Sequence, residues 1–212
     1  MNNAERIRNE KLGASLIKAL ALRHFDAYYC ASSSEAAEKI LSLIPKTDVV
    51  SWGGSMTMEA LGVIDRVKKG GWRVIDRSTA QSQEEKIEIT RSALLCDTYL
   101  TGANAISEDG EIVNVDGIGN RVAAMTFGPK SVVVACGINK VVKTAQDALS
   151  RARNTAAPVN AQRFDIRTPC KTTGICADCK STDSICSYIV CTRLCKPAGR
   201  IKVVLIGEAL GF

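Results

Sequence analysis

Histidine, aromatic residues and long apolar runs are all scarce in this sequence of 212 residues. His24 is the single histidine and is far in sequence from every motif described below, which argues against a histidine-based triad or a histidine-ligated metal. The longest apolar runs, such as residues 132–136, are far shorter than the roughly 18 residues that a membrane span needs. The N-terminal residues are polar and lack the hydrophobic segment of a secretory signal. We therefore expect a protein of the reducing cytoplasm that has no membrane partner.

The composition is that of a globular α/β protein. Apolar residues make up 46% and charged residues 24%, which is enough to bury a core. The formal net charge of +6 is unevenly distributed: residues 151–202 hold ten Lys and Arg against three Asp (+7), leaving 18 basic and 19 acidic residues elsewhere (−1). The excess positive charge therefore lies in the C-terminal part.

Strand and helix patterns alternate along the chain, as in a parallel sheet covered by helices. Helices are expected over residues 4–22, from a Ser32–Glu35 capping box to Pro45, and over 55–69, 83–95, 121–127 and 141–153. Strands are expected over residues 25–30, 48–52, 72–76, 97–101, 131–136 and 201–206. Residues 105–115 carry Asp109-Gly110 between two alternating apolar pieces, which predicts a β-hairpin inserted beside the sheet.

A glycine-rich turn, Trp52-Gly-Gly-Ser-Met-Thr-Met-Glu59, stands where a strand is expected to lead into a helix. Gly53 and Gly54 allow a ligand close to the backbone, and Ser55 and Thr57 add hydroxyl donors, so a phosphate or carboxylate would fit there. The turn matches neither the Walker nor the GxGxxG pattern. The alternative is a structural turn with a serine cap, in which Glu59 complements the helix dipole.

Polar and glycine residues are also concentrated at the expected ends of later strands. They comprise Thr101, Gly102 and Asn104, then Asp109 and Gly110, then Asn114, Asp116, Gly119, Asn120 and Arg121, and finally Gly128 and Lys130. Open α/β sheets hold ligands at the carboxyl ends of their strands. Each residue taken singly also suits a turn, but their concentration favours a ligand site.

The run from Asp97 to Ala123, continued by Gly128-Pro-Lys and Gly137-Ile-Asn-Lys, resembles the lactate-utilisation (LUD) domain family, which includes LutC-like proteins. The glycine turn lies where that family has its own. The resemblance implies a Rossmann-like sheet with an inserted hairpin, as in the NagB/RpiA/CoA-transferase-like fold. It also implies a connection with the oxidation of lactate or related hydroxy acids by an iron–sulfur-containing system.

Six cysteines lie within 26 residues, with the spacing Cys170-x5-Cys176-x2-Cys179-x6-Cys186-x4-Cys191-x3-Cys195. Thiols this dense in a reducing compartment predict a metal site. Four thiolates hold either zinc or a 4Fe–4S cluster, and the irregular spacing favours iron–sulfur. The phrase around the first four resembles the tail of small LUD proteins and implies Cys170, Cys176, Cys179 and Cys186 as ligands.

The remaining cysteines are expected to do less. Cys191 and Cys195 are substitute ligands or two half-buried thiols on one helix turn. Cys30, Cys96 and Cys136 are interpreted as packing residues, although Cys136 could face the ligand site.

The sequence thus predicts an α/β domain over residues 1–157, a cysteine-rich metal-binding segment over 158–200, and a strand within 201–212 that returns to the sheet. The first hypothesis is an iron–sulfur enzyme of organic-acid redox metabolism with an electron-transfer partner protein. In it Arg121 or Lys140 pairs the carboxylate of a small anionic substrate, and Glu59 or Asp116 moves a proton.

Two other functions compete with this one. The second hypothesis is a non-redox enzyme acting on a sugar phosphate or acyl-CoA, with a structural zinc. A third, a nucleic-acid-binding module, has the charge but only two aromatic residues in the basic segment, Phe164 and Tyr188, which argues against it. An oligomer is compatible with each hypothesis.

Overall fold

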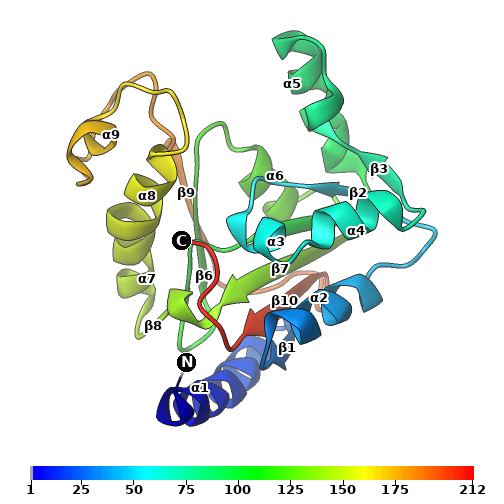
Figure 1. Ribbon diagram of the computed structural model, residues 1–212, viewed down its shortest axis with the longest axis vertical. Coiled ribbons are helices and arrows are strands. Elements are labelled where there is room, and N and C mark those ends of the chain that lie inside the picture. Colours follow the sequence, from blue (N-terminus) through cyan, green and yellow to red (C-terminus); the bar gives the residue numbers. More distant parts are fainter. Residues whose placement is uncertain (1) are drawn as a thin grey trace.

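The computed structural model describes residues 2–212, which form two sheets flanked by helices (Figure 1). The larger sheet has six parallel strands in the order β1-β10-β7-β4-β2-β3. Their bounds are β1 (Asp26–Cys30), β10 (Ile201–Ile206), β7 (Ser131–Gly137), β4 (Thr98–Gly102), β2 (Val49–Trp52) and β3 (Arg73–Ile75). The predicted α/β class with a mostly parallel sheet is confirmed. Among residues 2–212 no helix is both long and apolar enough to cross a membrane.

Helices cover both faces of this sheet because its central strands are apolar on both sides. In β7, Val132 and Val134 pack on one face with α1 (Asn3–Leu22) and α6 (Asn120–Thr126). Val133 packs on the other face with α2 (Ser33–Ser42), α3 (Met56–Ala60) and α4 (Val63–Lys69). Alternate residues of a strand point to opposite faces, so a continuous apolar run is the expected signature of such a strand.

The second sheet is built around the predicted hairpin, which is confirmed. Its strand order is β8 (Val141–Val142), β5 (Ala105–Ser107), β6 (Ile112–Asp116) and β9 (Tyr188–Thr192). β5 and β6 are antiparallel, and β9 extends the hairpin by pairing antiparallel with β6. The helix α7 (Ala145–Arg151) packs on this sheet through Ala148. The sequence did not predict β8 or β9.

Two of the expected helices differ from the structure. The expected helix 55–69 is divided into α3 and α4 at Gly62, whose positive φ of 63° interrupts the helical path. The expected helix 141–153 begins only at Ala145, because Val141–Val142 pairs with β5 and Thr144 caps α7 in a capping box with Asp147. A π-helical turn, Ala152–Ala156, then carries the chain into α8 (Ala157–Ala161).

The C-terminal part returns to the sheet as predicted. After α9 (Pro169–Thr173) and β9, strand β10 inserts between β1 and β7. Beyond β10 the last residues fold back toward the centre of the molecule (Figure 1), where Asn139 receives the Leu210 amide on its side-chain oxygen at 3.1 Å. The helix α5 (Gln83–Ser92), in contrast, projects away from the sheet and has no buried residue.

Candidate functional site

A cavity of about 650 Å³ lies between the carboxyl ends of the central strands and the segment that follows α8. Its walls carry five basic side chains and a single carboxylate. The basic residues are Arg77, Lys86, Arg121, Lys140 and Arg163, and the acidic residue is Asp116. An excess of cations around a hollow attracts anions, so the cavity is suited to an anionic ligand.

Eight of the thirteen predicted catalytic and binding residues line this cavity. They are Gly54, Ser55, Gly102, Asn104, Asp116, Asn120, Arg121 and Lys140. The other five, Gly53, Thr57, Glu59, Thr101 and Gly119, do not line it. Thr101 is fully buried, and Gly119 is the N-cap of α6 with φ 83°. The structure therefore gathers most of the predicted strand-end residues around one hollow.

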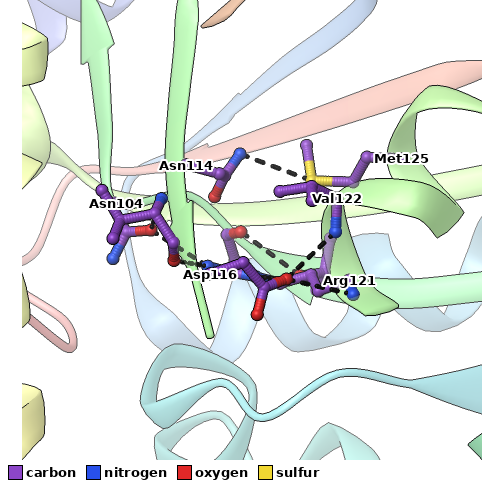
Figure 2. A network of polar contacts seen from close by, with 9 residues as sticks. Asn104, Asn114, Asp116, Arg121, Val122 and Met125 are labelled. Carbon is purple, nitrogen blue, oxygen red and sulfur yellow. Dashed lines mark hydrogen bonds and ion pairs between the residues drawn. The ribbon is translucent and has the colours of Figure 1, made fainter. Parts of the chain in front are cut away.

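The side chains of Asp116 and Arg121 form a polar network at the wall of the cavity (Figure 2). Asp116 Oδ2 accepts the backbone amides of Arg121 and Val122, each at 3.1 Å, and lies 3.7 Å from Arg121 Nε. Because Gly119 has no side chain to cap α6, the Asp116 carboxylate takes that part. Its second oxygen, Oδ1, has no hydrogen bond with any described residue.

The Arg121 guanidinium is held rigidly by the same network. Its Nη2 donates to Asn104 Oδ1 at 3.1 Å and to the Val115 carbonyl at 2.5 Å. Burial lowers the pKa of Arg121, and the nearby Asp116 opposes that change. Nη1 makes no hydrogen bond within residues 2–212 and is left for a ligand. Two residues before Asp116 on β6, Asn114 directs its amide nitrogen to Met125 Sδ at 3.4 Å (Figure 2).

The glycine turn supports the cavity by close packing. Ser55 caps α3, its Oγ accepting the Met58 amide at 3.2 Å. A Cβ on Gly102 would lie 2.8 Å from that oxygen, so only glycine at position 102 allows the end of β4 to lie this close to the turn. The helix α3 has five residues, too few for a strong dipole, and the attraction for an anion therefore comes from the cationic side chains.

Lys140 is the most buried of the cavity's cations. Its side chain is 4% exposed, and Nζ donates to Thr57 Oγ1 at 2.9 Å and to the Ala103 carbonyl at 3.3 Å. Burial lowers the pKa of this amine. Thr57, which was predicted to touch the ligand, instead positions Lys140.

Glu59 lies outside the cavity. Its half-exposed carboxylate lies 3.8 Å from Arg163 Nη2, so Glu59 pairs with a residue of the cavity wall without lining the cavity itself. Arg77, Lys86 and Arg163 were not predicted as site residues. Arg77 lies beside Gly54, where a Cβ on the glycine would be 3.4 Å from Arg77 Nη2. No local motif marks these three cations, since each comes from a different segment.

The four predicted metal ligands are partly buried free thiols. Burial, followed by the charges of Cys170, Cys176 and Cys179, raises the pKa of Cys186 to about 11, so the four lie within electrostatic range of one another. Within residues 2–212, however, no three Cys, His, Asp or Glu side chains meet in a metal-holding group. The donor chemistry of the four thiols fits a thiolate-bound metal, although their side chains do not converge on a position for a single metal ion.

The cysteine segment borders the cavity, because Ile166 and Ile185 contribute to its wall. Cys191 lies exposed on β9, whereas Cys195 is buried, accepting the Ile201 amide on Sγ at 3.2 Å. The prediction that these two share a helix turn is wrong, because residues 188–192 pair with β6. The remaining three cysteines, Cys30, Cys96 and Cys136, are buried, as expected of packing residues.

Comparison with known proteins identifies the class to which this fold and cavity belong. The family model of the LUD domain matches residues 14–206, and the chain therefore belongs to the LUD domain family, which is associated with lactate utilisation. The predicted resemblance is confirmed. None of the curated proteins compared with the chain matches it.

Two solved structures are similar to the chain. A DUF162 family protein from Deinococcus radiodurans shares the fold, with a TM-score of 0.55 at 13% identity, over 93% of this chain and 97% of that one. The eIF2B delta protein from Chaetomium thermophilum gives a TM-score of 0.34 at 17% identity, over 65% of this chain and 57% of that one. That value is too low to inform the fold.

Proposed function

We propose that the chain acts in the redox metabolism of small lactate-type hydroxy acids, which bind as anions in the cationic cavity. The observation that carries the proposal is the set of five basic residues and one carboxylate around a hollow whose wall is shared with the cysteine segment. The family's association with lactate utilisation supports the same reading. A cavity with this balance of charge favours a carboxylate ligand over a neutral one.

Within this proposal, the substrate carboxylate lies against Arg77 and Arg121 Nη1, which have no carboxylate of their own to bind at these atoms. Asp116 Oδ1 faces no competing donor and accepts a proton from the substrate hydroxyl. Oxidation of a 2-hydroxy acid to a 2-oxo acid releases two electrons and two protons. The O–H and Cα–H bonds of the substrate both break: the hydroxyl proton passes to Asp116, the second proton is released to solvent, and the two electrons leave singly for an oxidised electron-transfer partner protein, which is the oxidant.

Cys170, Cys176, Cys179 and Cys186 would hold a 4Fe–4S cluster, which supplies one-electron transfer when bound. Their mutual electrostatic influence on Cys186 supports this ligand set. The basic residues of the segment would offset the negative charge of four thiolates.

Anaerobic purification followed by iron and sulfide analysis tests the cluster. We expect visible absorption that dithionite bleaches, and loss of iron in Cys186→Ser. Cys191→Ser is the matched control, since Cys191 is exposed on β9 and lies outside the proposed set. A colourless, iron-free protein with stoichiometric zinc would refute the redox function.

The cavity itself favours a second candidate, an enzyme acting on a sugar phosphate or acyl-CoA with a structural zinc. A volume of about 650 Å³ with five cations exceeds what a ligand of lactate's size fills. A thermal-shift panel of L-lactate, ribose 5-phosphate and coenzyme A distinguishes the two candidates, since a ligand that binds the native state raises the midpoint temperature. Stabilisation by the phosphate-bearing compounds alone would favour the second.

A further inference from the structure

We propose that Lys140 forms a covalent imine with the carbonyl carbon of a 2-oxo acid bound in the cavity. This activity goes beyond the oxidation described above, in which Lys140 has no part. It rests on the proposed function in one respect, namely that the cavity binds the carboxylate of an organic acid.

The position of Lys140 places an amine where such an acid would bind. Lys140 ends the short turn η3 (Ile138–Lys140), directly after the central strand β7, and its side chain lines the cavity while remaining 4% exposed. Its Nζ donates to Thr57 Oγ1 and to the Ala103 carbonyl. A neutral amine has two N–H donors and one lone pair, so these two bonds use both hydrogens and leave the lone pair free.

The charges around Lys140 also favour the free amine. Within residues 2–212 no carboxylate lies within ion-pair distance of Nζ. Burial lowers the pKa of Lys140, Arg151 on α7 and Arg121 on α6 lower it further, and the thiol of Cys136 on β7 opposes them. A desolvated lysine beside other cations is the usual arrangement of an imine-forming amine.

The ligand's carboxylate has its own binding group nearby. Arg121 lies close enough to influence the Lys140 amine, and its Nη1 is free of contacts with the described residues. A 2-oxo acid carries its carbonyl on the carbon next to the carboxylate, so binding at Arg121 directs that carbonyl into the same cavity as the amine. The cationic wall thus selects an acid rather than a simple ketone or aldehyde.

The reaction balances without an oxidant or a reductant. The Nζ lone pair forms a bond to the carbonyl carbon, and both amine hydrogens leave with the carbonyl oxygen as water. The product is a carbon–nitrogen double bond between Lys140 and the acid. The hydrogen bonds to Thr57 and Ala103 are given up in this step.

Reductive trapping tests the inference on the full chain. The protein is incubated with pyruvate and sodium cyanoborohydride, and the intact mass is expected to rise by about 72 Da, the mass of pyruvate less water plus two hydrogens. Peptide mapping should place the adduct on Lys140, with labelling at least about tenfold above that of the exposed Lys143. Lys140→Met should lose the adduct, and Lys143→Met should keep it.

An absent adduct, labelling spread over exposed lysines, or an adduct that persists in Lys140→Met would each overturn the inference. If Lys140→Met does not fold, the peptide map of the unaltered protein still shows whether the adduct is on Lys140. L-Lactate, which has no carbonyl carbon at this position, separates the two proposals. Binding of L-lactate without trapping of pyruvate refutes the imine and leaves the proposed function intact, whereas trapping without any oxidation of L-lactate refutes the redox function alone.

Discussion

Replacement of Arg77 by glutamine is expected to separate ligand binding from stability. Arg77 lies in the turn η1 (Arg77–Thr79), in which the Ser78 amide donates to Asp76 Oδ1 at 2.9 Å, and its guanidinium lies beside Gly54 at the cavity. It forms no ion pair and no hydrogen bond with any described residue. The side chain therefore contributes little to the folded state and is available to an anion.

The size of the effect follows from the single contact that is lost. A hydrogen bond between a guanidinium and a carboxylate or phosphate contributes about 1.5–3 kcal/mol, which corresponds to a roughly 10- to 150-fold increase in Kd. The free energy of unfolding should change by less than about 0.5 kcal/mol, as for a substitution without native contacts.

Calorimetric titration with L-lactate, ribose 5-phosphate and coenzyme A measures the binding, and urea denaturation measures the stability. Arg73→Gln is the matched control, because Arg73 lies on the edge strand β3, donates to the Thr47 carbonyl and does not line the cavity. Both variants lose one positive charge, so an equal weakening of binding in the two would show that net charge alone acts. An unchanged Kd in Arg77→Gln would refute the placement of the anion.

Two further predictions concern the support of the cavity. Gly102→Ala should lower the free energy of unfolding by about 1–3 kcal/mol, because its Cβ would overlap Ser55 Oγ. Gly54→Ala should lower it much less. Urea denaturation that finds Gly54→Ala less stable than Gly102→Ala would contradict the packing described above. For Asp76, burial raises the pKa, but hydrogen bonds from Lys68 and the η1 turn hold it below its usual value. The folded state therefore binds fewer protons than the unfolded chain, and this stabilisation is present above about pH 4 and lost as pH falls through the folded pKa. Asp76→Asn should remove that acid-range slope, which urea melts between pH 3 and 7 would measure.

The parallel sheet could be predicted because its evidence is local. Residues 131–136 are apolar on both faces, and serine caps mark helix starts such as Ser32, whose Oγ accepts the Glu35 amide. The strand β9 was missed because its partner β6 lies some 75 positions earlier in the sequence, and Tyr188 and Ile189 are half exposed, so no apolar run marks it. The division of the helix at Gly62 depends on the positive φ of that residue, which cannot be predicted from the helical periodicity of residues 55–69.

The same distinction applies to the site. Gly54, Asn104 and Arg121 were found because strand ends share one edge of a parallel sheet. Arg77 and Arg163 reach the cavity only through tertiary packing, and neither belongs to a motif. Cys195 could not be distinguished from the other cysteines by spacing, since its burial depends on the later strand β10.

The placement of β10 bears on the order in which the molecule can be assembled during translation. Strand β1 joins the larger sheet only through β10, which is made some 170 residues later. Strand β1 therefore has no partner strand in the sheet until β10 has been made, after the cysteine segment. The cysteine segment is thus synthesised while the larger sheet is still open between β1 and β7, and the strand that closes this gap directly follows the segment.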